Sequence, residues 1–200
     1  MQDRRRLERG VRLLLEGVGR SRLGPEFERT VERVTQVWSE ELLRGYAGEP
    51  SAILSPIPAG SDRGWVVVRD LRFSSLCVHH LLPFFGKAHI AFVPDRCLVG
   101  LSKLARLVDC LARRLQIQET MTRQILEEID RCLRPRGAAV IVEAEHLCMT
   151  VRGVRSHGSR IITAAFSGIL ERDRARRRAI ESLIDARSSA RSSRASARVR

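Results

Sequence analysis

The sequence has little of what marks membrane or secreted proteins. No run of roughly 18 apolar residues occurs along the chain, so a membrane-spanning helix is not expected. The first six residues, Met-Gln-Asp-Arg-Arg-Arg, lead into an amphipathic pattern, whereas a secretory signal would have an apolar core there. The five cysteines are an odd number, which argues against a disulfide framework. We therefore expect a cytoplasmic protein with free thiols.

Lysine is almost absent although the chain is strongly basic. Lys87 and Lys103 are two of 36 basic residues, and all the others are arginines. The net charge is +13, and residues 171–200 contribute nearly half of it with ten arginines against four acidic residues. A basic tail can bind polyanions weakly, but a solvated end explains the pattern more simply, so we do not expect a nucleic-acid partner.

The apolar pattern predicts one mixed domain with a helical segment before it. Hydrophobic residues are 44% of 200 residues, enough for a single core. The pattern predicts helices over 4–17 and 26–45, a strand pair over 65–76 and 87–93 closed by Pro94-Asp95, two helices within 102–133 that break near Gln116, strands over 138–152 and 160–170, and a helix over 173–185. This order predicts an α+β domain with an antiparallel sheet.

These elements divide the chain into four expected parts. They are an N-terminal helical segment at 1–46, a Pro/Gly-containing linker loop at 47–64, the main domain at 65–186 and a tail at 187–200. The tail consists of Arg, Ser, Ala and one Val, a composition that cannot build a core, so we expect it to be disordered.

Cysteine and histidine recur at spacings that suit a metal. Cys77 and His80 are three residues apart, which is the spacing of half a zinc site. Cys148 lies in a strand-like stretch and could supply a third ligand, leaving a fourth position for water as in catalytic zinc sites. His79 and His146 would then lie beside the metal, where they could move protons. Spacing alone leaves open that these are separate buried thiols and core histidines.

The strand-like stretch also suggests which side chains share a face. On an extended strand, alternate side chains project together, so His146, Cys148, Thr150 and Arg152 would all point to one side. That face is polar where a core strand would be apolar. An extended chain would also carry Arg152 well beyond Cys148, toward a separate part of a ligand.

Two more groups suit a nucleotide. Ser102 is a favourable N-cap, and Lys103 and Arg106 share a face of the helix that it begins, which together suits an anion such as phosphate. Gln118 and Glu119 lie at the break between the two helices, where an amide and a carboxylate could bind the Watson–Crick edge of guanine. An ordinary capped helix and a helix-start glutamate are the alternatives.

Taken in order, these segments resemble the GTP cyclohydrolase I family of tunnelling-fold (T-fold) zinc enzymes. The resemblance covers about residues 64–170, with a fainter part over 11–45. Its motifs are Val-Arg-Asp at 68–70, Cys77-x-His79-His80, Gly86-Lys87-Ala88, Gly100-Leu101-Ser102-Lys103-x-x-Arg106, Gln116-x-Gln118-Glu119, His146-x-Cys148 and Arg152-Gly153. It implies a T-fold with two central helices, preceded by N-terminal helices.

The resemblance also implies roles for the candidate residues. Cys77, His80 and Cys148 would hold one Zn²⁺ per subunit, and His79 and His146 would transfer protons. Gln118 and Glu119 would hold guanine, while Ser102, Lys103, Arg106 and Arg152 would bind the ribose and triphosphate. The implied reaction opens the imidazole ring of GTP, releases formate and gives 7,8-dihydroneopterin triphosphate. The implied assembly is a homodecamer with active sites between subunits.

The chain departs from the family pattern at three places. Val78 stands where the family has glutamate, Val31 replaces a proline after Thr30, and the strand at 159–165 has fewer hydroxyl groups. Neither a ligand nor a proton-transfer histidine is lost. These departures keep an alternative open, a diverged T-fold protein that binds a purine or pterin without this catalysis.

Overall fold

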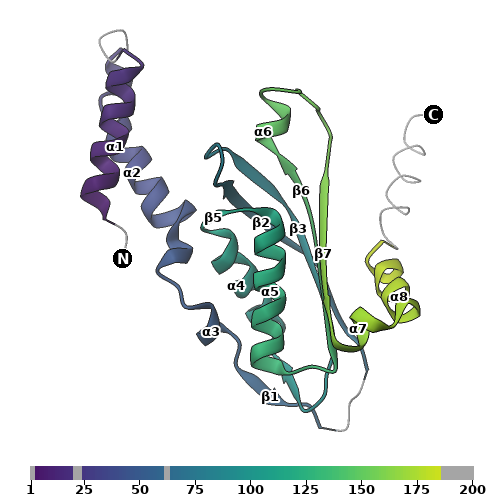
Figure 1. Cartoon of the computed structure of the whole chain (residues 1–200). Coiled ribbons are helices and arrows are strands. Elements are labelled where there is room, and N and C mark those ends of the chain that lie inside the picture. Colours follow the sequence, from purple (N-terminus) through teal and green to yellow (C-terminus); the bar gives the residue numbers. More distant parts are fainter. Residues whose placement is uncertain (1–2, 20–23, 61–63, 186–200) are drawn as a thin grey trace, which may run out of the picture.

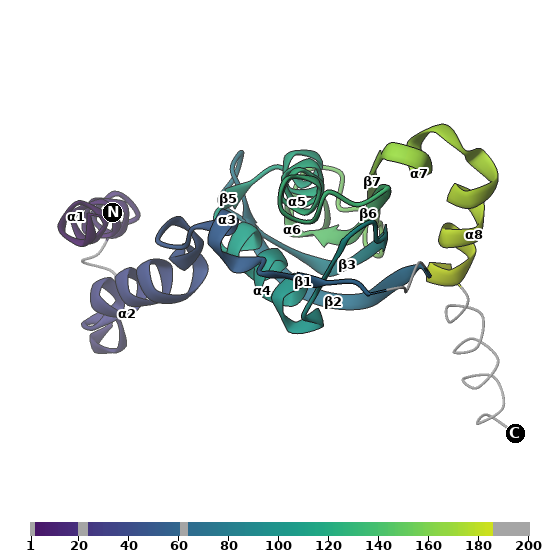
Figure 2. The same ribbon diagram turned by 90° about the horizontal axis from the view of Figure 1, so that it is seen from below.

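The computed structural model describes residues 3–19, 24–60 and 64–185. Its centre is a five-stranded sheet in the order β5-β2-β3-β6-β7, antiparallel except where β5 pairs with β2. The strands are β2 (Val66–Cys77), β3 (Pro83–Val93), β5 (Leu115–Gln116), β6 (Gly137–His146) and β7 (Ile161–Ser167). The helices α4 (Leu101–Ala112) and α5 (Gln118–Leu133) cover one face, as Figure 2 shows from below. The predicted α+β class, with a largely antiparallel sheet and two central helices, is confirmed.

The core lies between the two central helices and the sheet. Both apolar stripes predicted for these helices are buried, and they pack on alternate residues of β3 and β6. Fully buried members include Leu104, Leu107, Met121, Ile125, Ile129, Phe84, Ile90, Phe92, Val140 and Val142. Burial of one such side chain contributes roughly 1.5–3 kcal/mol, so this layer fixes how α4 and α5 sit over the strands.

A smaller apolar cluster holds the C-terminal helices on the opposite face. The helices α7 (Gly168–Arg172) and α8 (Arg174–Asp185) place Leu170 and Ile180 against Ala91, Val93 and Ala139. Figure 1 shows them at the end of the sheet far from α6 (Leu147–Thr150). The helix predicted over 173–185 is therefore confirmed, with one short helix before it.

The N-terminal segment is more irregular than predicted. The helix α1 (Arg4–Gly17) has the predicted bounds, but residues 26–45 form several short helices of different types instead of one α-helix. They contain the 3-10 helix η2 (Pro25–Phe27), α2 (Thr30–Gln36), the π-helix η3 (Val37–Leu42) and the 3-10 helix η4 (Arg44–Tyr46). Within the π-helix, the Ser39 hydroxyl donates to the carbonyl of Thr35 at 2.8 Å, a side-chain bond that competes with the main-chain bonds of a regular helix.

Three other sequence predictions were wrong in detail. The linker 47–64 contains α3 (Pro50–Ile53) and β1 (Pro56–Pro58), which pairs with β4 (Cys97–Val99). The turn between β2 and β3 spans residues 78–82, because β2 continues through a bulge at Asp70 as far as Cys77. The second predicted strand pair also ends earlier, since β6 stops at His146.

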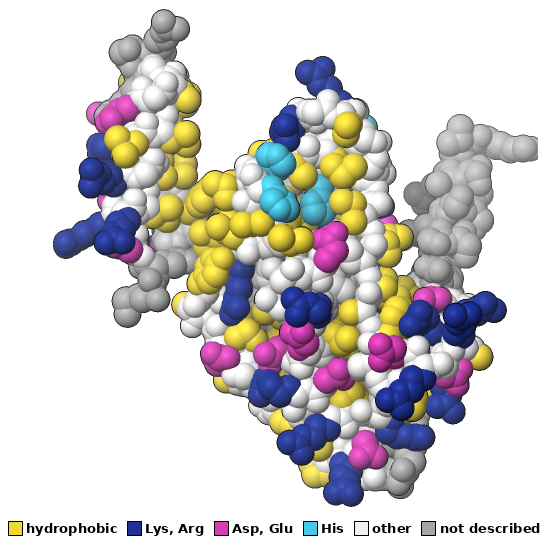
Figure 3. Space-filling model, in the orientation of Figure 1, with side chains coloured by type: hydrophobic (Ala, Val, Ile, Leu, Met, Phe, Trp, Pro, Cys, Tyr) yellow, Lys and Arg dark blue, Asp and Glu magenta, His cyan; other side chains and the backbone are white. Residues whose placement is uncertain are grey.

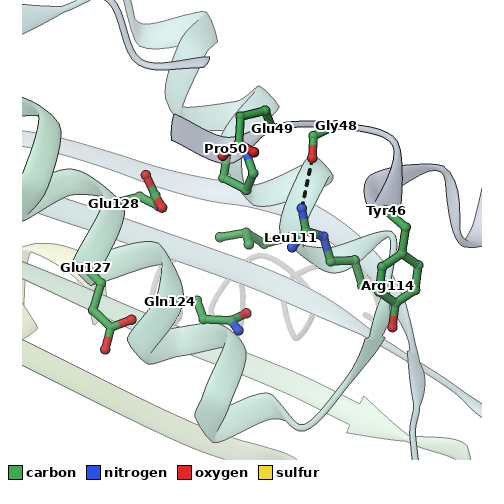
Figure 4. A pocket seen from close by; sticks show the side chains of 9 residues that line it. All are labelled: Tyr46, Gly48, Glu49, Pro50, Leu111, Arg114, Gln124, Glu127 and Glu128. Carbon is green, nitrogen blue, oxygen red and sulfur yellow. Dashed lines mark hydrogen bonds between the residues drawn. The ribbon is translucent and has the colours of Figure 1, made fainter. Parts of the chain in front are cut away.

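Arg114 joins the N-terminal segment to the domain through hydrogen bonds. Its Nε donates to the Gly45 carbonyl at 3.0 Å and its Nη2 to the Gly48 carbonyl at 3.1 Å. The guanidinium also lies over the Tyr46 ring. Arg114, Tyr46 and Gly48 line a cavity of about 480 Å³, shown in Figure 4, whose other lining side chains include Gln124 and three glutamates.

Other parts of the sequence-based organisation stay predictions. In Figure 1 the α1–α2 pair stands away from the sheet, as a separate N-terminal segment would, but the domain boundaries themselves are not tested. The tail predicted to be disordered, 187–200, lies outside the described residues. Among the helices that the structure describes, none is long and apolar enough to cross a membrane.

Candidate metal centre and substrate site

Cys77, His80 and Cys148 come together at one end of the sheet. One ligand atom from each lies within 4.8 Å of the other two. Cys77 ends β2 and is buried, His80 lies in the exposed turn after it, and Cys148 comes from α6 at the end of β6. The three residues that spacing suggested as metal ligands are therefore neighbours in the fold.

The turn after β2 is shaped by main-chain hydrogen bonds. The Leu81 N–H donates to the Cys77 carbonyl at 2.8 Å, and the Cys77 N–H donates to the Leu82 carbonyl at 2.9 Å. Leu81 has a φ of 55°, a left-handed conformation that turns the chain back into β3. The Val78 N–H donates to the Gln116 carbonyl at 3.1 Å, which ties this turn to the break between α4 and α5.

Cys148 reaches the cluster from a helical turn, which corrects the strand predicted there. Residues Leu147–Thr150 form α6, and the Val151 N–H donates to the Leu147 carbonyl at 3.0 Å. The chain therefore turns back after Thr150 instead of running on as a strand, and Arg152 follows in the turn after α6. Arg152 consequently lies at the metal cluster, with Nη1 2.8 Å from His80 Nε2, and not far beyond it.

The donor set suits zinc. Two thiol sulfurs and an imidazole nitrogen are ligands that Zn²⁺ accepts in catalytic sites with an open fourth position. Burial raises the pKa of the Cys148 thiol, and the neighbouring Cys77 thiol raises it further. The Cys148 thiol is therefore a poor thiolate by itself, and a bound dication would reverse that preference. These residues fit a zinc ion better than they fit an ordinary core.

His146 is held rigidly next to this cluster. Its ring stacks on Phe84 with 4.4 Å between centroids and 9° between planes, as the β3–β6 register predicts for directly paired residues. Its Nε2 lies 2.8 Å from Gln118 Oε1. Burial lowers the pKa of His146, and the charge of Glu119 partly offsets that effect. The second histidine, His79, is exposed, with Nδ1 3.6 Å from Cys77 Sγ.

Gln118 lies inside the domain instead of facing a ligand. It is 2% exposed, and its amide nitrogen lies 3.1 Å from the Val142 carbonyl and 3.0 Å from the Ile161 carbonyl. Those contacts fix the amide orientation, so its oxygen faces His146 and accepts the Nε2–H. The expected contact with guanine does not fit this placement. Glu119, the next residue, is exposed on the first turn of α5.

The segment predicted to bind phosphate begins α4, at the end of the helix pair that lies far from the metal cluster. Gly100 is the N-cap of α4, so Ser102 lies inside the first turn and the expectation of a serine cap was wrong. The residues just before α4 share a cavity with Arg131–Arg134 at the C-terminal end of α5. Since α5 spans about 24 Å at ~1.5 Å per residue, Ser102 and Lys103 in the first turn of α4 lie far from the metal cluster of their own chain, whereas Arg106 lies in the middle of α4.

Exposed apolar side chains surround the metal cluster. Figure 3 shows the histidines grouped on one face with hydrophobic atoms around them. The exposed apolar residues of this region are Val78, Leu81, Phe85, Ile117 and Val151. Exposed apolar side chains near a polar centre are typical of a surface that another protein surface covers.

The sequence reasoning missed two supporting side chains. Phe84 stacks on His146, and Thr163 lies 3.1 Å from the Gln118 amide nitrogen. The Phe84 contact depends on strand register, which single-sequence patterns do not give. Burial of Gln118 had a visible signal, because it precedes Met121, Thr122 and Ile125 at helical spacing on the buried stripe of α5.

The fold and cluster together define a class. An antiparallel sheet covered by two central helices, with a Cys-His-Cys group beside a buried histidine, is a T-fold domain with a candidate catalytic zinc site. The family model for GTP cyclohydrolase I matches residues 7–185, and the chain belongs to this family.

Curated relatives agree over most of the chain. The GTP cyclohydrolase 1 of Desulforamulus reducens is 42% identical over 185 residues, covering 92% of this chain and 98% of the relative. That of Brucella anthropi is 46% identical, covering 82% and 78%, and that of Aquifex aeolicus is 42% identical, covering 86% and 91%. A solved archaeosine synthase QueF-Like chain has a TM-score of 0.46 and 17% identity over 54% of this chain and 97% of its own, a likeness too low to carry an argument.

Proposed function

We propose that this chain is a GTP cyclohydrolase I that opens the imidazole ring of GTP. The reaction hydrolyses the purine at C8, releases formate and gives 7,8-dihydroneopterin triphosphate. One observation carries the proposal, namely that Cys77, His80 and Cys148 converge within 4.8 Å beside His79 and His146. Relatives named GTP cyclohydrolase 1 at 42–46% identity support the same activity.

The three ligands would hold one zinc ion per subunit. Zinc would supply Lewis acidity that lowers the pKa of a water at the fourth position toward neutrality. Cys77 and His80 sit on a turn fixed by hydrogen bonds, while Cys148 sits on a separate helical turn. A zinc ion held by these three residues would have a fourth position open for water.

His146 is the residue that this environment best prepares to accept a proton. Gln118 Oε1 accepts its Nε2–H, so the lone pair of the neutral ring is on Nδ1. Burial lowers its pKa, which keeps the ring neutral and able to act as a base near pH 7. His79 is exposed beside Cys77 and can exchange protons with solvent.

Substrate binding would use Glu119 for the base. Its exposed carboxylate can accept the N1–H and the amino group of guanine together. Arg152 lies at the metal cluster and would bind an anionic oxygen of the same nucleotide. Gln118 supports the site indirectly, through His146.

The triphosphate site would need a second subunit. Ser102 and Lys103 lie in the first turn of α4, at the opposite end of the helix pair from the metal cluster of their own chain, and Arg106 lies in the middle of that helix. The exposed apolar side chains near the cluster and the long outer edge of β2, which β5 pairs at two residues only in the described structure, offer surfaces for a neighbour. These features support a homo-oligomer with sites between subunits, and the family decamer is the assembly we expect. A cytoplasmic location and a place in pterin synthesis remain predictions.

The test is a direct assay of both products. Purified protein is incubated with GTP and zinc, formate is quantified, and the pterin product is detected by its fluorescence after oxidation. Equal amounts of formate and neopterin triphosphate are expected. Intact GTP after prolonged incubation of the zinc-loaded protein would refute the proposal.

Val78 favours a second candidate, a diverged protein that binds a purine or pterin without turnover. It is exposed beside Cys77, where an apolar side chain neither accepts hydrogen bonds nor offsets the charge of a metal. Tight GTP binding with no formate release would support this candidate. If Val78→Glu then restored formate release, the missing carboxylate would be the cause.

A further inference from the structure

The edge strand β5 is held on both of its sides by residues that are far from it in the sequence. Its inner side faces the end of β2, where the Gln116 carbonyl accepts the Val78 N–H at 3.1 Å. Its outer side has no further strand in the described sheet, and there the Leu115 N–H donates to the Tyr46 hydroxyl at 3.3 Å. Successive residues of a strand direct their main-chain groups to opposite edges, so the two bonds hold opposite edges of the same two-residue strand.

The backbone around Tyr46 is fixed against the end of α4. The Gly45 N–H donates to the Arg113 carbonyl at 2.9 Å, and a Cβ on Gly45 would lie 2.7 Å from that oxygen. Only glycine permits this close approach. The Arg114 guanidinium bonds the Gly45 and Gly48 carbonyls and lies over the Tyr46 ring (Figure 4). The N-terminal segment therefore brings the Tyr46 hydroxyl to β5 from a docked position.

The inner side of β5 lies next to the candidate metal ligands. Cys77 pairs with Gln116 in the parallel register. Val78, whose N–H bonds Gln116, is the first residue of the turn that carries His80. Two hydrogen bonds and the short strand between them thus connect the Tyr46 hydroxyl to this turn. A shift of β5 would move the main chain beside Cys77 without any change in the ligands themselves.

We propose that Tyr46 is a positioning residue for the candidate metal centre. Its hydroxyl holds β5 against β2, so the docked N-terminal segment keeps the turn after Cys77 in the arrangement that binds metal. Tyr46 itself touches neither a ligand nor the nucleotide. A two-residue edge strand has few bonds of its own, so loss of the hydroxyl lets it open more often. Metal binding selects the closed form, and the apparent affinity falls in proportion to the closed fraction.

The first test measures amide hydrogen exchange of the full, metal-free chain in the parent and in Tyr46→Phe. Tyr46 is 50% exposed, so the variant loses one hydrogen bond and creates no buried cavity. Exchange in the peptides that contain Leu115 and Val78 should rise about 3- to 10-fold. Arg44→Met is the matched control, because it removes the Arg44–Asp109 ion pair of the same segment at 2.5 Å and leaves β5 untouched. Unchanged exchange in these peptides, or an equal rise in the control, would overturn the proposal.

The second test titrates the same proteins with Co²⁺, whose visible absorption bands report thiolate coordination at a zinc-type site. Tyr46→Phe should bind Co²⁺ about 3-fold more weakly than the parent, with the same band positions because the ligands are unchanged, while Arg44→Met should keep the parental affinity. Equal affinity in Tyr46→Phe and the parent would refute the role of Tyr46 alone. The titration rests on the zinc site of the proposed function, so a parent that bound no Co²⁺ would refute that site and the positioning role with it.

Discussion

Gln118 Oε1 and His146 Nε2 lie 2.8 Å apart, and this buried hydrogen bond joins the first residue of α5 to the last residue of β6. It sets the tautomer of the histidine that we expect to accept a proton. The Gln118 amide nitrogen is anchored in turn by the carbonyls of Val142 and Ile161, so the pair has one orientation. The role that we propose for His146 thus depends on Gln118, a side chain buried inside the domain.

Removal of the Gln118 amide should impair turnover more than binding. Gln118→Met frees His146 to rotate or to change tautomer, and we expect kcat to fall by about 10- to 100-fold with a small change in KM. Gln116→Met is the matched control, because Gln116 is also buried and its amide bonds Leu111 and Gln124 away from His146. Steady-state kinetics with GTP provide the measurement. An equal loss of kcat in both variants would mean that Gln118 acts only through stability.

Glu119 should determine which base is accepted. Glu119→Gln places an amide donor opposite the guanine N1–H, so kcat/KM for GTP should fall by at least about 100-fold. Glu127→Gln on the same helix removes an equal charge from an exposed pair with Arg123 and should change kcat/KM little. If Glu119→Gln retained the parental kcat/KM, the base would have to be bound elsewhere.

Stability should fall on acidification because of His89. His89 is buried and accepts the Asp70 N–H through Nδ1, and burial lowers its pKa. The charges around it come from Asp70, Lys87, Glu143 and Arg69. Because the unfolded histidine takes up a proton at higher pH than the folded one, the free energy of unfolding decreases as pH falls below the ordinary histidine pKa of about 6.5.

A pair of variants tests the His89 assignment. His89→Asn keeps an acceptor for the Asp70 N–H and removes the titration, so urea unfolding between about pH 7 and pH 5 should show a flatter pH dependence. His157→Asn changes an exposed histidine and should keep the parental slope. Identical slopes for the parent and His89→Asn would show that other groups cause the acid sensitivity.

Gly168 should be intolerant of any side chain. Its φ is +56°, and a Cβ there would lie 2.2 Å from the Arg136 carbonyl oxygen. Gly168→Ala should therefore cost more than about 2 kcal/mol, combining left-handed strain with a backbone clash. Gly153→Ala has a similar φ of +58° and open space, so thermal unfolding should show a smaller loss. Equal losses would leave strain alone as the cause.

The sequence predicted those elements whose apolar pattern repeats over many residues. The stripes of α4 and α5 extend over three turns or more, which is enough for periodicity to identify them. The α6 turn at Cys148 has four residues, too few for a helical pattern, and its β-branched surroundings favoured a strand. The separation of Lys103 from the metal cluster followed from antiparallel packing of the helix pair, a tertiary fact that motif order does not contain.

The central claim is that Cys77, His80 and Cys148 hold the zinc on which GTP ring opening depends. The most direct measurement is zinc content and formate release on the same preparation of the parent, Cys148→Ala and Cys132→Ala. Cys132 is a partly buried thiol on α5 whose Sγ contacts the Ser51 carbonyl, away from the cluster. The parent and Cys132→Ala should each hold about one zinc per chain and release formate, whereas Cys148→Ala should lose both, since two remaining ligands bind zinc poorly. Full zinc content or undiminished formate release in Cys148→Ala would contradict the account.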